Sequence, residues 1–134
     1  MSPETKVEIM LMGVKGEKEQ IGSGGGTLSS GIKVGNMLFM SGFVRSSRAL
    51  QGDMAGQTRA IMEQITGVLG EAGMDFTDVV NSSVFITDVR NFGAMNDVYR
   101  EFVTQGPPPR ATVGAALMSA RGLVEIEMFA ARDN

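Results

Sequence analysis

The chain has 134 residues, which fits one domain that can bury a hydrophobic core without disulfides. It contains no cysteine and no histidine, and its net charge is −3. These absences exclude disulfides, thiolate nucleophiles, Ser-His-Asp triads and zinc sites built on cysteine or histidine. The acidic balance, together with the lack of a basic tract with interleaved aromatic residues, argues against a nucleic-acid partner.

The start of the chain is predicted to add an edge strand, because apolar residues alternate at Val7, Ile9 and Leu11. The glycine-rich run at 22–26 predicts a mobile loop, since it lacks the lysine and hydroxyl of a phosphate-binding P-loop. No apolar run approaches the ~20 residues that span a bilayer, and no basic region precedes a long apolar core. We therefore expect a cytoplasmic protein without a membrane partner.

A β-hairpin is predicted next. The apolar runs at 32–34 and 37–40 flank Gly35 and Asn36, a dipeptide suited to the positive φ angles of a tight turn. Such a turn joins two antiparallel strands, so the main domain is expected to begin with this hairpin.

Two helices are predicted from apolar residues that recur at helical spacing. The first spans 53–72, with Asp53 suited to cap its start and Gly73 suited to end it. The second opens near Asn91. Four of its residues are expected on the side that faces the core: Phe92, Met95, Tyr99 and Phe102.

Three further strands are predicted at 78–88, 111–117 and 123–131 from their content of Val, Phe, Ile and Thr. The order of the elements predicts an α+β domain with two helices packed on one face of a mixed β-sheet. We assign residues 27–134 to this domain and residues 1–26 to an N-terminal extension. The uncovered sheet face needs a partner, and a homo-oligomer would supply one.

A candidate site lies in the last quarter of the chain. Three prolines, 107–109, make the approach to Arg110 stiff and extended. On the last strand, Glu125 and Glu127 alternate with apolar residues and leave the same face. A guanidinium can grip a carboxylate through two hydrogen bonds, and a glutamate can activate water, so these charges in one small cleft would suit hydrolysis of a small acid. The alternative is that they are ordinary solvated surface charges.

Three motifs occur in order: NMLFMSG at 36–42, VFITDVRNFGAMNDVY at 84–99, and PRATV followed by LVEIE at 109–127. With them the chain resembles the reactive intermediate deaminase family, RidA or YjgF-like, from about residue 30 to 131. The resemblance implies a chorismate-mutase-like α+β fold and a homotrimer with small-molecule sites between subunits. It also implies no metal and no organic cofactor.

Active members of that family hydrolyse reactive enamines and imines, such as 2-aminoacrylate and 2-iminobutyrate, to a 2-keto acid and ammonia. The resemblance places Arg110 on the arginine that grips the substrate carboxylate, and Glu125 on the glutamate that handles the attacking water. Ser41 and Asn96 fall on positions that line or support the cleft. From the residues alone, these two could equally be a strand-end hydroxyl and a helix-surface amide.

The sequence departs from the family pattern at three positions. Leu28 or a neighbour stands where many members have a tyrosine, Thr112 replaces a cysteine of the best-known branch, and Ser119 replaces a proline before the final strand. The rim of the pocket is therefore expected to differ. A larger substrate, such as the amino-dienoate 2-aminomuconate, stays open, as do a carboxylate-binding regulatory trimer without turnover and a chaperone-like role. An endoribonuclease or translation inhibitor is disfavoured by the charge and by the lack of histidine.

Overall fold

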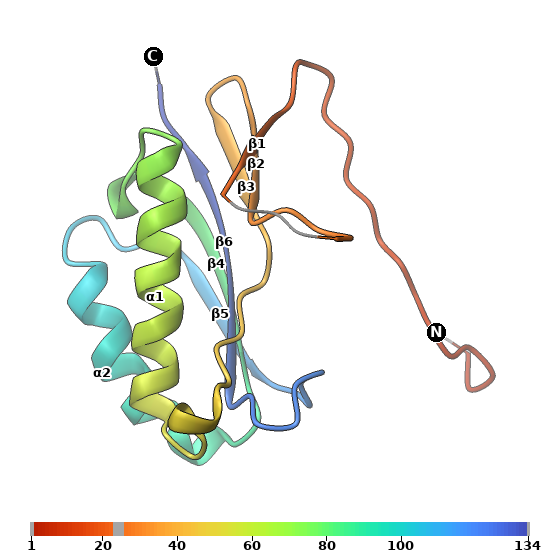
Figure 1. The fold of residues 1–134 in the computed structure, drawn as a ribbon, viewed down its shortest axis with the longest axis vertical. Coiled ribbons are helices and arrows are strands. Elements are labelled where there is room, and N and C mark those ends of the chain that lie inside the picture. The colour runs from red at the N-terminus through yellow and green to blue at the C-terminus, as the bar shows by residue number, and fades with distance from the viewer. Residues whose placement is uncertain (1, 23–25, 134) are drawn as a thin grey trace.

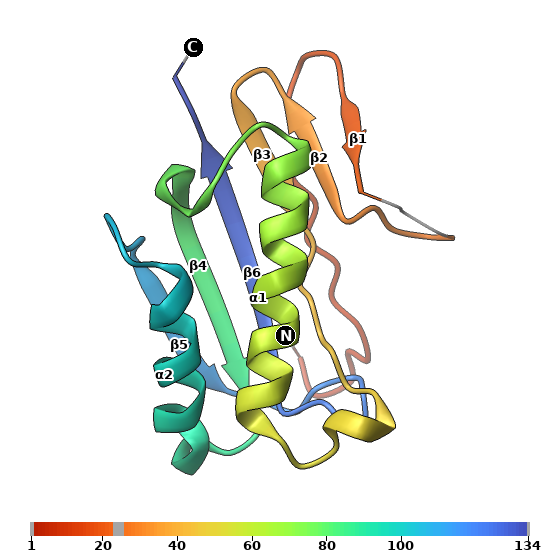
Figure 2. The ribbon, with the colours of Figure 1, turned by 60° about the vertical axis from the view of Figure 1, so that its left-hand side comes forward.

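A computed structural model describes residues 2–22 and 26–133 of the chain. Two α-helices pack on one face of a six-stranded mixed sheet, and no helix of the described residues covers the other face (Figures 1 and 2). The strands are β1 (Glu19–Ile21), β2 (Gly31–Val34), β3 (Met37–Met40), β4 (Val79–Ile86), β5 (Arg110–Gly114) and β6 (Val124–Ala131). The helices are α1 (Met54–Glu71) and α2 (Phe92–Phe102), with single 3-10 turns η1 (Arg48–Leu50), η2 (Phe76–Asp78) and η3 (Val89–Asn91). The predicted α+β architecture is confirmed.

The strands lie in the order β1-β2-β3-β6-β4-β5. Strands β4 and β5 run parallel, and the other neighbouring strands run antiparallel. A parallel pair needs a crossover connection, and α2 provides it, which places this helix over the β4–β5 end of the sheet (Figure 2). Arg110, the first residue of β5, therefore starts beside α2.

The predicted hairpin and first helix are confirmed. Strands β2 and β3 pair through the tight turn at Gly35, whose φ of 58° favours glycine. Asp53 caps α1, with its side-chain oxygen accepting a hydrogen bond from the Gly56 N–H at 2.8 Å. Beyond the helix Gly73 adopts a φ of 75°, the left-handed conformation that ends many helices.

Strand β5 ends at Gly114, three residues earlier than expected from the sequence. It is an edge strand, and β4 is its sole neighbour in the sheet. Because β4 ends at Ile86, which pairs with Gly114, the ladder has nothing further to pair with. Residues 115–117 therefore leave the sheet and lead into the loop before β6.

The two faces of the sheet differ as the alternation in β6 predicts. Its core-facing residues are almost fully buried beneath the helices: Val124, Ile126, Met128 and Ala130. Glu125, Glu127 and Phe129 leave β6 on the other side, which we call the open face. There Phe129 meets Phe39 of β3 edge to face, with ring centroids 4.5 Å apart. The open face is thus partly apolar without a covering helix.

The expectation that four residues of α2 face the core is wrong for Phe92. Met95 and Tyr99 are buried and Phe102 packs against the core, but Phe92 is 40% exposed. Phe92 is the first residue of the helix and lies beyond the core, and its ring contacts Arg110. This residue belongs to the candidate site described below.

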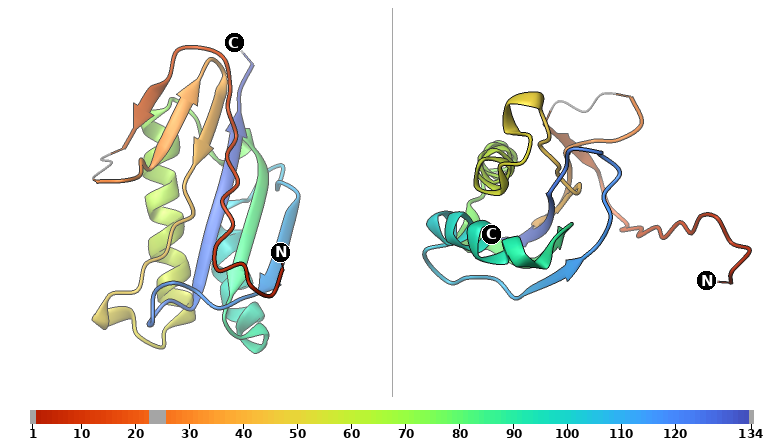
Figure 3. Two further views of the ribbon diagram at one scale, coloured as in Figure 1. Left: turned by 90° about the vertical axis from the view of Figure 1, so that its right-hand side faces the viewer. Right: turned by 90° about the horizontal axis from the view of Figure 1, so that it is seen from below.

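The expected edge strand at Val7, Ile9 and Leu11 is also wrong. The edge strand is β1, at Glu19–Ile21, which pairs with β2. The side chains at 7, 9 and 11 are 68–89% exposed, and the segment runs away from the sheet (Figure 3). Ile21 explains why the edge strand forms at Glu19–Ile21, because its side chain is 1% exposed and joins the core. The alternating side chains at 7, 9 and 11 do not reach the core. The predicted loop at 22–26 falls mostly on residues 23–25, which lie outside the described residues.

Candidate active site

Arg110 is held by side chains of α2. Its Nη2 donates a hydrogen bond to Asn96 Oδ1 at 2.8 Å. Its guanidinium carbon lies 4.6 Å from the centroid of the Tyr99 ring and 5.6 Å from that of Phe92. A planar guanidinium stacks well on aromatic rings, so these contacts fix its position while leaving other N–H groups for a ligand.

Arg110 has no carboxylate partner among the described residues. The ion pairs found there involve four other arginines: Arg59, Arg90, Arg100 and Arg132. Yet Arg110 is half-buried and rests against aromatic rings rather than water. Removing a charge from water is costly unless an opposite charge compensates. An anionic ligand would supply that compensation.

A cavity of about 370 Å³ adjoins Arg110, between α2 and the proline-rich approach to β5. It is lined by Asn96, Tyr99, Arg100, Val103, Pro107, Pro108 and Arg110. Two of the three prolines predicted to stiffen the approach, Pro107 and Pro108, thus form one wall of this cavity. Its size admits a small organic acid beside the guanidinium.

Three buried hydroxyls near Arg110 have no hydrogen-bond partner among the described residues: those of Ser82, Tyr99 and Thr112. Ser82 pairs with Arg110 across β4 and β5, and Thr112 follows two residues later on the same side of the strand. A buried unpaired hydroxyl costs about 1–3 kcal/mol, so such groups are uncommon in native proteins outside functional sites. We call Asn96, Tyr99, Arg110 and Thr112 the arginine half-site.

Glu125 lies on the open face, half-buried beside the loop that follows β3. The carboxylate lies where a Cβ atom at position 42 would be, so Gly42 lets it approach the main chain closely. Main-chain hydrogen bonds between Phe43 and Ile126 hold this loop against β6. The predicted Ser41 stands next to Gly42, and its hydroxyl donates to the Ser29 carbonyl at 2.6 Å. We call Ser41, Gly42 and Glu125 the glutamate half-site.

Leu28 immediately precedes Ser29 and is 66% exposed. Its side chain is therefore available for contact with another molecule. It lies close to the glutamate half-site, because the carbonyl of the next residue, Ser29, accepts the hydrogen bond from Ser41. Ser119, the third departure from the family pattern, bonds its hydroxyl to that of Ser46 at 2.5 Å. Ser119 thus ties the loop before β6 to the segment after Gly42.

The expectation that Arg110 and Glu125 face one cleft is wrong within a single chain. Strand β4 lies between their two strands. Arg110 pairs with Ser82, whose side chain is buried on the helix-covered face, whereas Glu125 pairs with Phe85 of the other parity. Residues opposite each other in a sheet share a face and consecutive residues alternate, so the two charges leave opposite faces. One chain therefore holds two separate half-sites.

Sequence reasoning missed Gln57, a fully buried residue of α1. Its amide nitrogen donates to the carbonyls of Leu50 and Arg121, at 3.0 and 2.9 Å, and its oxygen accepts from the Leu123 N–H at 2.8 Å. These bonds fix the loop that leads into β6, two residues before Glu125. The available signal was a glutamine among the residues of the buried helix face, which are apolar apart from Thr58.

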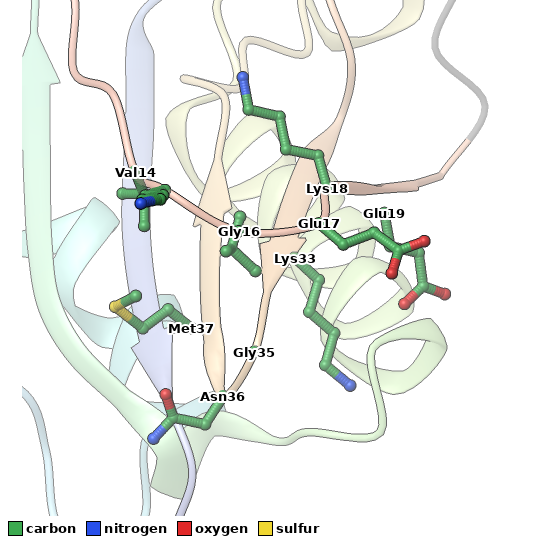
Figure 4. Close-up of a pocket in the computed structure, with 11 residues that line it drawn as sticks. Val14, Gly16, Glu17, Lys18, Glu19, Lys33, Gly35, Asn36 and Met37 are labelled. Carbon is green, nitrogen blue, oxygen red and sulfur yellow. The ribbon is translucent and has the colours of Figure 1, made fainter.

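A larger cavity, of about 840 Å³, lies between residues 14–19 and the turn of the β2–β3 hairpin (Figure 4). It contains none of the predicted site residues. The amino groups of Lys18 and Lys33 point in opposite directions there (Figure 4), and Lys33 Nζ donates to the Ala72 carbonyl at 3.1 Å. The cavity therefore does not gather charge of one sign around a ligand.

Among residues 2–22 and 26–133, no group of three or more acidic side chains is placed to hold a metal ion. The same part of the chain contains no helix long and apolar enough to cross a membrane.

Two helices packed on a mixed six-stranded sheet make this an α+β protein of the kind seen in solved YjgF and L-PSP structures. One of these, the E. coli TdcF structure with bound serine, superposes with a TM-score of 0.77 at 28% identity, covering 87% of this chain and all of that one. The chain belongs to the Endoribonuclease L-PSP family, the RidA/YjgF family, whose sequence profile matches residues 23–132. The resemblance found in the sequence is confirmed.

Two relatives illustrate the range of names in this family. The chain is 33% identical over 112 residues to a RutC family protein of Pyrococcus horikoshii, covering 81% of this chain and 89% of that protein. It is 31% identical over 109 residues to the 2-iminobutanoate/2-iminopropanoate deaminase of Bos taurus, covering 78% and 80%. The family thus includes deaminases and also carries an endoribonuclease name, so membership of the family does not by itself identify the activity of this chain.

Proposed function

We propose that this chain hydrolyses 2-imino acids, formed from reactive enamines such as 2-aminoacrylate, to 2-keto acids and ammonia. The observation that carries the proposal is Arg110, a half-buried guanidinium without a carboxylate partner among the described residues, beside a cavity of small-molecule size. The names of the Bos taurus and Capra hircus relatives as 2-iminobutanoate/2-iminopropanoate deaminases support this choice of reaction.

In the proposed mechanism the substrate carboxylate binds the free N–H groups of Arg110, while Asn96 and the Tyr99 ring hold the guanidinium still. Glu125 accepts a proton from a water molecule, whose oxygen attacks the carbon of the C=N bond. The resulting carbinolamine loses ammonia as the C–N bond breaks and the C=O bond forms. Water supplies the oxygen. The proton that Glu125 takes from the water passes to the imine nitrogen as the carbinolamine forms, and Glu125 then transfers the hydroxyl proton of the carbinolamine to the nitrogen that leaves as ammonia.

This mechanism requires two copies of the chain, because Arg110 and Glu125 leave opposite faces of one sheet. The arginine half-site of one copy would face the glutamate half-site of another. A cyclic homotrimer would repeat this contact three times and close on itself, leaving no half-site unused. We therefore propose the homotrimer with intersubunit sites as the working assembly.

The test is the rate of 2-keto acid formation from enzymatically generated 2-aminoacrylate and 2-iminobutyrate, against the uncatalysed rate. We expect acceleration by the native protein and its loss in Arg110→Ala. Glu125→Gln should retain ligand binding and lose rate, because the amide keeps the shape but cannot accept the proton. Glu127→Gln is the matched control, two residues along the same face and exposed. Full acceleration by Arg110→Ala would refute the proposal.

A second candidate is the same chemistry on a larger amino-dienoate such as 2-aminomuconate. It is favoured by the departure from the family pattern at Leu28 or a neighbour, where many members have a tyrosine, and by the buried unpaired hydroxyl of Thr112; Leu28 is 66% exposed. Faster turnover of the dienoate than of 2-iminobutyrate would select it. Binding of the keto acid product of either substrate, with no turnover of the substrate itself, would indicate a regulatory role instead.

A further inference from the structure

The N-terminal segment before residue 13 carries an apolar run that its own chain leaves in water. Five of its large apolar side chains are 68–89% exposed: Val7, Ile9, Met10, Leu11 and Met12. We call residues 7–12 the arm. An exposed apolar cluster of this kind usually marks a contact surface. The arm lies outside the residues that match the family profile, so the proposed reaction does not account for it.

The backbone of the arm is also unpaired. Within residues 6–13, no main-chain N–H or C=O takes part in a backbone hydrogen bond, although the segment is extended. Residues 14–19 lie beside the turn of the β2–β3 hairpin. Followed from there towards the N-terminus, the chain runs outward, away from the sheet and the body of the domain (Figures 1 and 3). An extended segment with free backbone groups is suited to pairing with another chain.

The same chain presents a matching groove. A cavity of about 300 Å³ on the open face is lined by Met12, Val14, Lys18, Ile32, Val34 and Phe39. All of these but Lys18 are apolar, and the groove lies over strands β2 and β3. Of its own arm only Met12 lines this groove, whereas Val7, Ile9 and Leu11 do not. Lys18 at the groove and Glu8 within the arm carry opposite charges.

We propose that residues 7–12 of one copy of this chain pack into the β2–β3 groove of a second copy. Ile9 and Leu11 enter the apolar groove, and Glu8 lies beside Lys18 of the receiving copy. The occupant is another copy because the arm and the groove are present on every chain and match in polarity and charge, yet within one chain only Met12 of the arm lines the groove. The arm therefore strengthens the association that the two half-sites require.

The chain has no cysteine, so introduced cysteines report this contact without background. The experiment mixes tagged full-length Leu11→Cys with untagged full-length Lys18→Cys and adds a short bis-maleimide crosslinker. We expect a tagged–untagged product. Untagged Val89→Cys replaces Lys18→Cys as the control, because Val89 is 66% exposed on η3 and lies outside the groove. An equal yield with this control overturns the proposal, and so does the absence of any product.

The rival occupant of the groove is the arm of the same chain, folded back at Gly13. A Leu11→Cys, Lys18→Cys double variant separates the two, since a product within one chain, with none between tagged and untagged chains, also overturns the proposal. Association is measured separately by sedimentation. Ile9→Ser with Leu11→Ser should raise the dissociation constant at least about tenfold. Glu4→Ser with Lys6→Ser, which likewise leaves the net charge unchanged, should not, and an equal effect of both pairs contradicts arm docking.

Discussion

Replacing Arg110 by lysine separates the charge of the guanidinium from its shape. The ammonium of Arg110→Lys keeps the positive charge and three donors, but it cannot bond the Asn96 oxygen and a ligand carboxylate in one plane. It also loses the contact between the guanidinium and the Tyr99 ring; in the native protein the guanidinium carbon lies 4.6 Å from the ring centroid. We therefore expect the lysine variant to lose most of its activity although it keeps the charge.

The size of the effect follows from the bonds that are lost. A charge-assisted hydrogen bond contributes about 1.5–3 kcal/mol, and lysine can keep at most one of the two that a guanidinium makes to a carboxylate. Since about 1.4 kcal/mol is a factor of ten, kcat/KM should fall by about 10- to 150-fold.

The assay is steady-state 2-keto acid formation from 2-iminobutyrate, with thermal unfolding to confirm that each variant is folded. Arg59→Lys is the control, because Arg59 is exposed and pairs with Glu101 away from the cavity. A lysine variant within about twofold of the native rate would show that charge alone suffices, and the argument from planar geometry would be refuted.

Three further predictions concern the surroundings of the site. Tyr99→Leu should have a KM about 2- to 30-fold higher than that of Tyr99→Phe, because both lack the hydroxyl but only phenylalanine keeps the cation–π contact; equal values for both would contradict this. Gln57→Leu should lower the free energy of unfolding in urea by about 2–4 kcal/mol, because buried main-chain groups lose their partner, whereas the exposed control Gln51→Leu should change it by less than about 0.5 kcal/mol. The hydrogen bonds from Arg90 lower the pKa of Asp88 to about 2, so its stabilising contribution is complete above about pH 4 and is lost as the pH falls toward 2; an NMR titration should find this value, and Arg90→Ala should raise it.

Local signals allowed much of the fold to be predicted. The Gly35 turn, the Asp53 cap and the Gly73 stop each depend on a few neighbouring residues, and each is confirmed. The arm at 7–12 has the alternation of a strand, but a strand also needs a neighbour and a core contact. Among residues 2–22 only Ile21 reaches the core, and that contact depends on the packing of distant elements.

The candidate site could be predicted in its residues and not in its arrangement. Arg110 is the first residue of β5 and Glu125 the second residue of β6, and these strands follow one another in the sequence, which suggests a shared cleft. Strand β4 lies between those strands and pairs with both, so its register determines that Arg110 and Glu125 leave opposite faces. This register is a property of the whole sheet. Gly42 and Gln57 were missed for the same reason, because their contacts with Glu125 and with the loop before β6 join segments far apart in sequence.

The central claim is that Arg110 of one copy works with Glu125 of another, and mixing two inactive variants tests it directly. Arg110→Ala and Glu125→Gln would be unfolded together, refolded as a mixture and assayed with 2-iminobutyrate. In randomly mixed cyclic oligomers, about a quarter of the intersubunit sites receive both native residues, so about a quarter of the native rate should return. Each variant refolded alone should stay inactive. No recovery in mixed oligomers, verified with distinguishable tags on the two variants, would contradict the shared site.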